Sequence, residues 1–146
     1  MKKTFGYRKT ALHVLMVIMM LLFAGNVHAQ KWMMILRKPD SRVFVNKMVI
    51  PDKYGYRVFV MFSFDTPAAR RDIRTYYGIK RTPYFEITGF IFNGTWTKMA
   101  QAIDNLLDAN GKKIYSNQSS RLEWRYVDGY VEKKIAHIAR KYYNEQ

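Results

Sequence analysis

The chain has 146 residues, with 25 Lys and Arg against 11 Asp and Glu, which gives a formal net charge of +14 at pH 7. It contains no cysteine, so disulfides, thiol nucleophiles and cysteine-ligated metals are excluded. The length suits a single domain, and the excess of positive charge predicts attraction to polyanions such as nucleic acid or acidic glycan.

Residues 1–29 have the features of a bacterial secretory signal peptide. Their positive start consists of Lys2, Lys3, Arg8 and Lys9. An apolar run over 11–24, short for a membrane span, precedes a cleavage site that ends at Ala29. Cleavage would remove four of the 25 cations and none of the 11 acids, leaving a net charge of +10 on a periplasmic or secreted protein. An uncleaved membrane anchor is the alternative.

The first half of the remaining chain is typical of strands. Residues 31–37 and 42–50 are strand candidates separated by a turn. Residues 56–64 are apolar on both faces, which predicts a strand in the middle of a sheet. The loop at 51–55 has hairpin length, so 42–50 and 56–64 are expected to be antiparallel neighbours.

A helix is predicted over 67–77. Thr66 can serve as its N-cap, Pro67 suits the first helical position, and Gly78 suits the residue after the last turn. Residues 84–92 form the next predicted strand. A parallel arrangement of 56–64 and 84–92 across this helix is an alternative, and it would require a right-handed crossover.

The segment that follows Asn93-Gly94 allows two interpretations. A helix that begins at Thr97 would place several apolar side chains at helical spacing, namely Met99, Ala100, Ile103, Leu106 and Leu107. The alternative is a hairpin over 106–115 about Asn110-Gly111. The helix is favoured because five apolar positions fit its period.

The C-terminal segment predicts a strand and a helix. Apolar and polar residues alternate over 121–127, as in an antiparallel strand with one wet face. A last helix is expected from Gly129 to about Tyr143, with Asp128 as N-cap, although Ser120 and Glu123 also match a capping box. Its expected buried stripe is Val131, Ile135, Ile138, Ala139 and Tyr142.

Together these elements predict a single α+β domain over residues 30–146. Its sheet would be mainly antiparallel, with four or five strands and two or three helices in the order β-β-β-α-β-α-β-α.

The titratable residues do not predict an enzyme. His137 is the one histidine outside the signal, and no two acids have the spacing of a catalytic or metal-binding pair, so no cofactor or metal is expected. Glu86 is the most notable acid because its strand is otherwise apolar. A buried carboxyl group needs a partner and has a raised pKa, whereas an exposed one would face water or an arginine.

Two basic clusters are candidate anion-binding sites. The first lies on and after the helix at 67–77 and consists of Arg70, Arg71, Arg74, Lys80 and Arg81. The second lies on the last helix and consists of Lys133, Lys134, Arg140 and Lys141, with His137, Tyr142 and Tyr143 among them. Cations at helical spacing can grip one phosphate or carboxylate together. Solvated cations near a helix C-terminus are the simpler alternative.

Residues 77–85, Tyr-Gly-Ile-Lys-Arg-Thr-Pro-Tyr-Phe, followed by Phe-Asn-Gly at 92–94, resemble the second half of a thioredoxin-like domain. The resemblance implies that Pro83 is a cis-proline at the start of a strand, and that a turn and a terminal helix follow it. It also implies an α/β fold as an alternative to the α+β domain. The redox Cys-x-x-Cys of that family is missing here, so its redox activity does not carry over.

The sequence therefore predicts a small, basic, non-enzymatic exported protein that binds or assembles with another protein of the bacterial cell envelope. The first alternative is a binder of polyanions, nucleic acid or envelope glycan, through the two basic clusters. The second alternative is a redox-inactive thioredoxin-like module. No stable membrane span is expected once the signal is cleaved.

Overall fold

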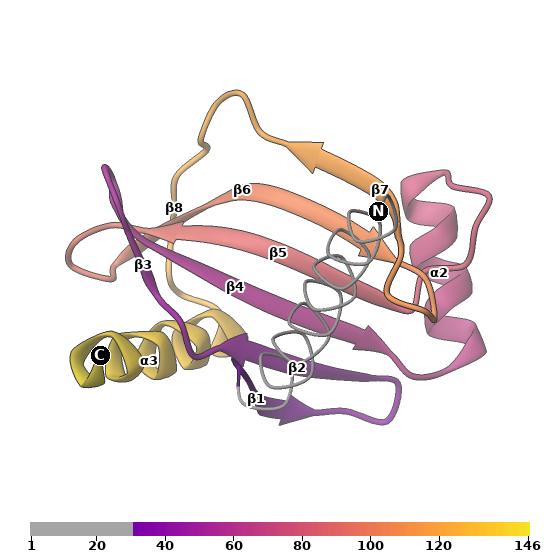
Figure 1. Cartoon of the computed structure of the whole chain (residues 1–146), viewed down its shortest axis with the longest axis horizontal. Coiled ribbons are helices and arrows are strands. Elements are labelled where there is room, and N and C mark those ends of the chain that lie inside the picture. Colours follow the sequence, from indigo (N-terminus) through magenta and orange to yellow (C-terminus); the bar gives the residue numbers. More distant parts are fainter. Residues whose placement is uncertain (1–30) are drawn as a thin grey trace, which may run out of the picture. The chain divides into compact units, whose positions relative to one another are not determined.

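The computed structural model describes residues 31–146, of which Met33–Gln146 form one compact unit. The predicted signal peptide at 1–29 lies outside the described residues. In chain order the elements are β1 (Trp32–Arg37), β2 (Ser41–Asn46), β3 (Ile50–Asp52), β4 (Gly55–Phe64), α2 (Pro67–Tyr77), β5 (Phe85–Phe92), β6 (Lys98–Leu107), β7 (Lys113–Gln118), β8 (Arg125–Tyr126) and α3 (Tyr130–Glu145) (Figure 1). Within residues 31–146, neither helix combines the length and apolarity that crossing a membrane requires.

The strands form one sheet whose main path is β1-β2-β4-β5-β6-β7 (Figure 1). Two short strands extend it, since β3 pairs with β4 and β8 pairs with β6. The β2–β4, β3–β4, β4–β5, β5–β6, β6–β7 and β6–β8 pairs are all antiparallel. β4 therefore lies inside the sheet, as predicted for residues 56–64.

α2 is inserted between two strands that are direct neighbours. β4 and β5 pair over their whole length, from Tyr56 opposite Phe92 to Ser63 opposite Phe85. Beyond that ladder the Phe64 amide donates to the Tyr84 carbonyl at 2.9 Å, which closes the insertion at its base. The parallel alternative for these two strands is therefore wrong.

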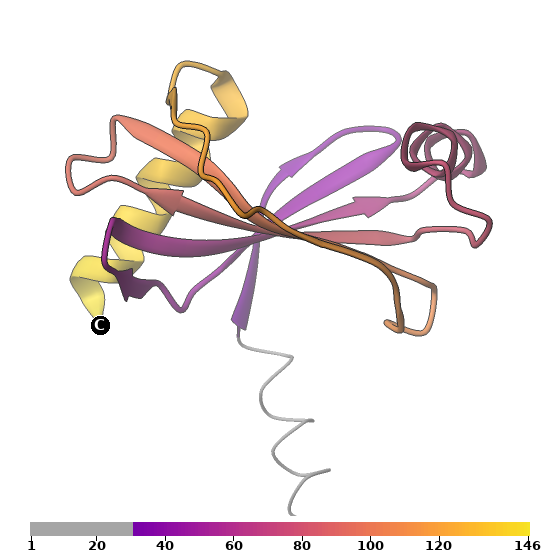
Figure 2. The same cartoon turned by 90° about the horizontal axis from the view of Figure 1, so that it is seen from above.

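Both helices cover the same face of the sheet (Figure 2). The buried core on this face joins β1, β2, β4, β5, β6 and α3 and contains Ile35, Val43, Val45, Val49, Val58, Val60, Phe90, Phe92, Met99, Ile135, Ala136 and Ala139. The stripe predicted for the last helix is confirmed, because Ile135 and Ala139 are buried and its other three members pack against this core.

The opposite face carries neither α2 nor α3. Side chains such as Phe44, Phe59, Met61 and Ile87 lie on it and are half-buried. The apolar residues on both faces of β4 therefore correctly predicted a strand in the interior of the sheet. Among the described residues, however, helices lie on only one of these two faces.

The predicted fold class is wrong. The described chain has an eight-stranded antiparallel sheet and two helices, in place of four or five strands with two or three helices in the expected order. The segment predicted as a helix from Thr97 is strand β6. Its hairpin alternative is the observed arrangement, because β6 and β7 pair across the turn at 108–112.

A β-bulge explains why β6 has a helix-like pattern. The register between β5 and β6 shifts at Gly89/Phe90, where Gln101 and Ile103 face successive residues of β5 and Ala102 is the extra residue. The shift places Met99 and Leu106, seven residues apart, on the same face, as two turns of a helix also would. The backbone of β5 needs hydrogen-bond partners along its length, and β6 supplies them.

Two other strand predictions have different limits in the structure. The candidate over 42–50 is split into β2 and β3, both paired with β4. The candidate over 121–127 is reduced to the two residues of β8. The last helix begins one residue later than expected, with Gly129 as its N-cap.

The thioredoxin-like α/β alternative is wrong as a fold. The strand that follows Pro83 is antiparallel to β4, and Asn93-Gly94 leads into β6 and not into a helix. The peptide bond before Pro83 is not cis, and neither is any other bond in residues 31–146. The redox-inactive module therefore lacks the fold on which it depended.

Candidate anion-binding sites

Local sequence signals fix the first basic cluster on α2. The Ala69 amide donates to Thr66 Oγ1 at 3.2 Å, which makes Thr66 the N-cap, and Pro67 occupies the first turn. At the other end Gly78 has a left-handed φ of 63°, and its amide donates to the Thr75 carbonyl at 3.1 Å. No residue of α2 is buried, so its arginines remain accessible to a ligand.

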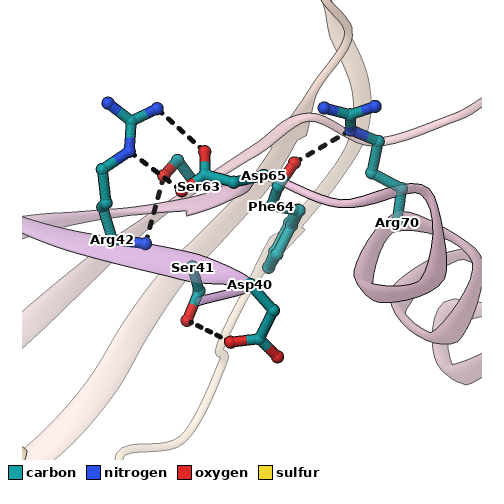
Figure 3. Close-up of polar contacts among 7 residues, drawn as sticks. All are labelled: Asp40, Ser41, Arg42, Ser63, Phe64, Asp65 and Arg70. Carbon is teal, nitrogen blue, oxygen red and sulfur yellow. Dashed lines mark hydrogen bonds and ion pairs between the residues drawn. The ribbon is translucent and has the colours of Figure 1, made fainter. Parts of the chain in front are cut away.

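Arg70 is held in place by its surroundings. Its Nε donates to the Phe64 carbonyl at 2.9 Å (Figure 3). Its guanidinium carbon lies 4.0 Å from the centre of the Tyr84 ring. Within the described residues its two terminal nitrogens make no hydrogen bond. An arginine fixed in this way loses little side-chain entropy when it binds an anion.

The nearby acid Asp65 is already neutralised by another residue. Arg42 donates from Nε and Nη2 to the two carboxylate oxygens of Asp65, at 2.9 and 2.8 Å (Figure 3). These hydrogen bonds hold the pKa of Asp65 below its ordinary value. Arg70 makes no salt bridge with a carboxylate of the described residues, although its charge also contributes to the lowered pKa of Asp65.

The arginines of α2 surround one hollow, which we call the arginine groove. It has a volume of about 340 Å³ and is lined by Pro67, Arg70, Arg71, Arg74, Thr82 and Tyr84. No carboxylate lines it. Three arginines and two hydroxyl-bearing residues around one space provide donors that fit the oxygens of a phosphate, sulfate or carboxylate.

The predicted cluster is only partly assembled here. Arg70, Arg71 and Arg74 come together because positions three and four apart share a helix face. Lys80 and Arg81 do not line the groove, and Arg81 instead lies 3.5 Å from Asp108.

The second cluster divides between two sides of α3. Lys133, His137 and Arg140 share one side and line a hollow of about 470 Å³ together with Thr95 and Thr97, which we call the α3 hollow. Lys134 and Lys141, seven residues apart, do not line it. Lys134 lies 5.9 Å from the Tyr130 ring centre, and Lys141 lies 3.9 Å from Glu145.

Glu86 belongs to a separate, partly buried polar cluster beside α2. The Tyr77 hydroxyl lies 2.9 Å from Glu86 Oε1 and 2.5 Å from Asp104 Oδ2, while Asp104 Oδ1 is buried without a partner. Burial and the neighbouring Asp104 raise the pKa of Glu86 to about 7. Within the described residues the carboxyl group accepts from the Tyr77 hydroxyl and is paired with no arginine.

Sequence reasoning missed the partners that other elements contribute. The segment before β5 contributes Thr82 and Tyr84 to the arginine groove. The β5–β6 turn contributes Thr95 and Thr97 to the α3 hollow. The partners of Glu86 come from α2 and β6, namely Tyr77 and Asp104. These contacts depend on the position of α2 between the paired strands β4 and β5, and on residues 98–107 being a strand and not a helix. Within residues 31–146, no three His, Asp or Glu side chains are grouped so that they could hold a metal ion.

The chain was compared with protein-family models, curated proteins and solved structures. No family model, no curated protein and no solved structure matches the chain.

Proposed function

We propose that the protein is a non-enzymatic binding component that acts after export and holds polyanions in the arginine groove. The observation that carries the proposal is the convergence of Arg70, Arg71 and Arg74 on a space that no carboxylate lines. The ligand class is a polymer with closely spaced phosphate, sulfate or carboxylate groups, such as nucleic acid or an acidic envelope glycan.

The distribution of acids supports this assignment. Five acids pair with cations elsewhere in the described chain, namely Asp65, Asp52, Asp108, Glu132 and Glu145. Two more, Glu86 and Asp104, lie in the buried cluster. The cations of the arginine groove have no acid within 4 Å among residues 31–146, so their charge is available to a ligand.

The experiment is the retention of the full chain on a heparin column in a NaCl gradient. The test variant is Arg71→Glu/Arg74→Glu, which spares the hydrogen bond from Arg70 to Phe64. It should elute at lower salt, and the slope of log Kd against log salt should fall by about one to two, because two ionic contacts are lost.

The matched control is Lys47→Glu/Lys53→Glu. Both lysines are exposed. Lys47 follows the end of β2 that is far from α2, and Lys53 lies in the β3–β4 turn, so the control makes the same change in net charge away from the groove. This control variant should elute from heparin at close to the NaCl concentration at which the wild type elutes. Equal losses in the two variants would show that net charge alone governs binding, and would overturn the proposal.

A further inference from the structure

A further hollow of the described chain lies away from both basic clusters. It has a volume of about 690 Å³ and is lined by residues of β6, of the end of β7, and of the segment at 119–125, whose last residue begins β8. We call it the Trp124 groove. Its size is within the range of roughly 300–1,000 Å³ that small-ligand sites occupy.

The walls of the Trp124 groove carry polar side chains with unused hydrogen-bonding capacity. They include Gln101, Asn117, Gln118, Ser119 and Ser120. None of these five side chains makes a hydrogen bond to another residue within 31–146. Amides and hydroxyls both donate and accept, which matches a ligand whose hydroxyl groups do the same.

Trp124 supplies an aromatic surface to this groove. Its side chain is 38% exposed, although the ring is held edge-on against Tyr54 with 6.3 Å between ring centres. An indole combines an apolar face with one polar N–H group, so an exposed indole suits a ligand that has an apolar face and a polar rim. The C–H face and the hydroxyl rim of a sugar ring have this character.

The charges around the Trp124 groove are balanced, in contrast to the arginine groove. Arg121 and Glu123 carry opposite charges, and Arg125 is paired with Glu132. A wall without excess positive charge gives a polyanion no electrostatic advantage. The balance favours an uncharged ligand.

We infer that the Trp124 groove binds a neutral saccharide, with a sugar ring against the Trp124 indole and its hydroxyl groups bonded to the amide and hydroxyl side chains of β6, β7 and the segment at 119–125. This site is independent of the arginine groove and does not require the proposed polyanion binding.

The test is an NMR titration of the isotope-labelled full chain with three neutral probes: cellotetraose, chitotetraose and maltotetraose. At least one of them should shift the backbone amides of Gln101 and residues 117–125 and leave those of α2 in place. The shifts should persist in high salt, because no ionic contact is involved. Trp124→Ala should weaken the apparent affinity about tenfold, as expected for the loss of a stacking surface.

The matched control is Tyr76→Ala, which removes an aromatic ring that is 82% exposed on α2, outside the groove. It should bind the saccharide as the wild type does, and so should Arg71→Glu/Arg74→Glu, which separates this site from the arginine groove. The inference is overturned if none of the three probes shifts the groove amides at tens of millimolar, or if Trp124→Ala binds as tightly as the wild type. It is also overturned if heparin, and not a neutral saccharide, produces the shifts in this groove.

Discussion

Tyr77, Glu86 and Asp104 place one hydroxyl hydrogen between two carboxyl groups. The Tyr77 hydroxyl can donate to only one of its two acceptors, which lie at 2.9 and 2.5 Å. The second contact then requires a proton on a carboxyl group. The pKa of Glu86, raised to about 7 mainly by burial, agrees with that requirement. The cluster therefore stores a proton that the unfolded chain would release at lower pH.

Glu86→Gln should remove a pH dependence of stability. The unfolded chain loses the Glu86 proton near 4.5, whereas the folded chain keeps it up to about 7, so unfolding releases a proton between these values. The free energy of unfolding of the wild type should therefore fall by up to about 3 kcal/mol as the pH rises through this window. Urea unfolding of the variant at several pH values should show no such fall.

Asp72→Asn is the control for this prediction, because Asp72 is an exposed carboxylate on α2. It should retain the wild-type fall in stability between pH 4.5 and about 7. An unchanged slope in Glu86→Gln would mean that another group holds the proton.

Tyr77→Phe should destabilise the protein by about 1–3 kcal/mol, because it removes the hydroxyl group that contacts the buried Asp104 and the half-buried Glu86. Asp104 is only 4% exposed, and its Oδ1 already lacks a partner, so water cannot easily replace the lost hydroxyl. Tyr76→Phe removes a hydroxyl from the adjacent, exposed residue and should cost nothing measurable. Thermal unfolding measures the stability of both variants. Similar losses of stability in Tyr77→Phe and Tyr76→Phe would show that the Tyr77 hydroxyl does not stabilise the cluster.

At the scale of elements, local signals predicted α2, α3 and the interior position of β4. Thr66, Pro67 and Gly78 fix the limits of α2 by contacts within a few residues, so the sequence is sufficient to identify them. β6 was missed because its bulge opposite Gly89/Phe90 produces a helical spacing of apolar residues. That bulge is a property of the β5–β6 pair, and no pattern within β6 alone reveals it.

The tight β3–β4 turn depends on Gly55. Its φ is +146°, and a Cβ atom at this position would lie 2.0 Å from the Phe92 carbonyl oxygen, on the neighbouring strand β5. Gly55→Ala should therefore destabilise the protein by about 2–4 kcal/mol, since neither backbone can move without disturbing the ladder.

Gly94→Ala provides the matched control for Gly55→Ala. Gly94 lies in the β5–β6 turn, no atom lies within 4 Å of its added Cβ, and its φ is not in the left-handed region. Urea unfolding should show a stability close to that of the wild type. A small loss in Gly55→Ala would indicate that the β3–β4 turn can adopt another geometry.

At the scale of the whole molecule, each of the two helices on the sheet (Figure 2) carries cations that line a hollow. The arginine groove and the α3 hollow lie on different helices and share no residue. A long polyanion that contacts both would gain from each, and the two contributions should be nearly additive.

Lys133→Glu/Arg140→Glu should therefore lower heparin retention by itself, and it should lower retention further when combined with Arg71→Glu/Arg74→Glu. Both substituted residues line the α3 hollow, and neither has an acid within 4 Å among residues 31–146. If the combined variant elutes at the same NaCl concentration as Arg71→Glu/Arg74→Glu, the α3 hollow does not contribute to binding.

The candidate sites were predictable only where one helix supplies all the residues. Helical spacing brings Arg70, Arg71 and Arg74 together, and it also separates Lys133 from Lys134. Tyr84 and Thr97 could not be assigned, because each reaches its site through tertiary folding. The Trp124 groove was not predicted at all, since it is formed by β6, β7 and an irregular segment that was expected to be a strand.

The hydrogen bond from Phe64 to Tyr84 closes the stem from which α2 projects, and the two strands of that stem already pair without help from the helix. Replacing residues 65–83 by a tight turn would therefore remove the arginine groove and leave the β4–β5 pair in place. Glu86 and Asp104 would then lose their contacts with the Tyr77 hydroxyl of α2. A shortened chain would therefore need uncharged residues at both positions.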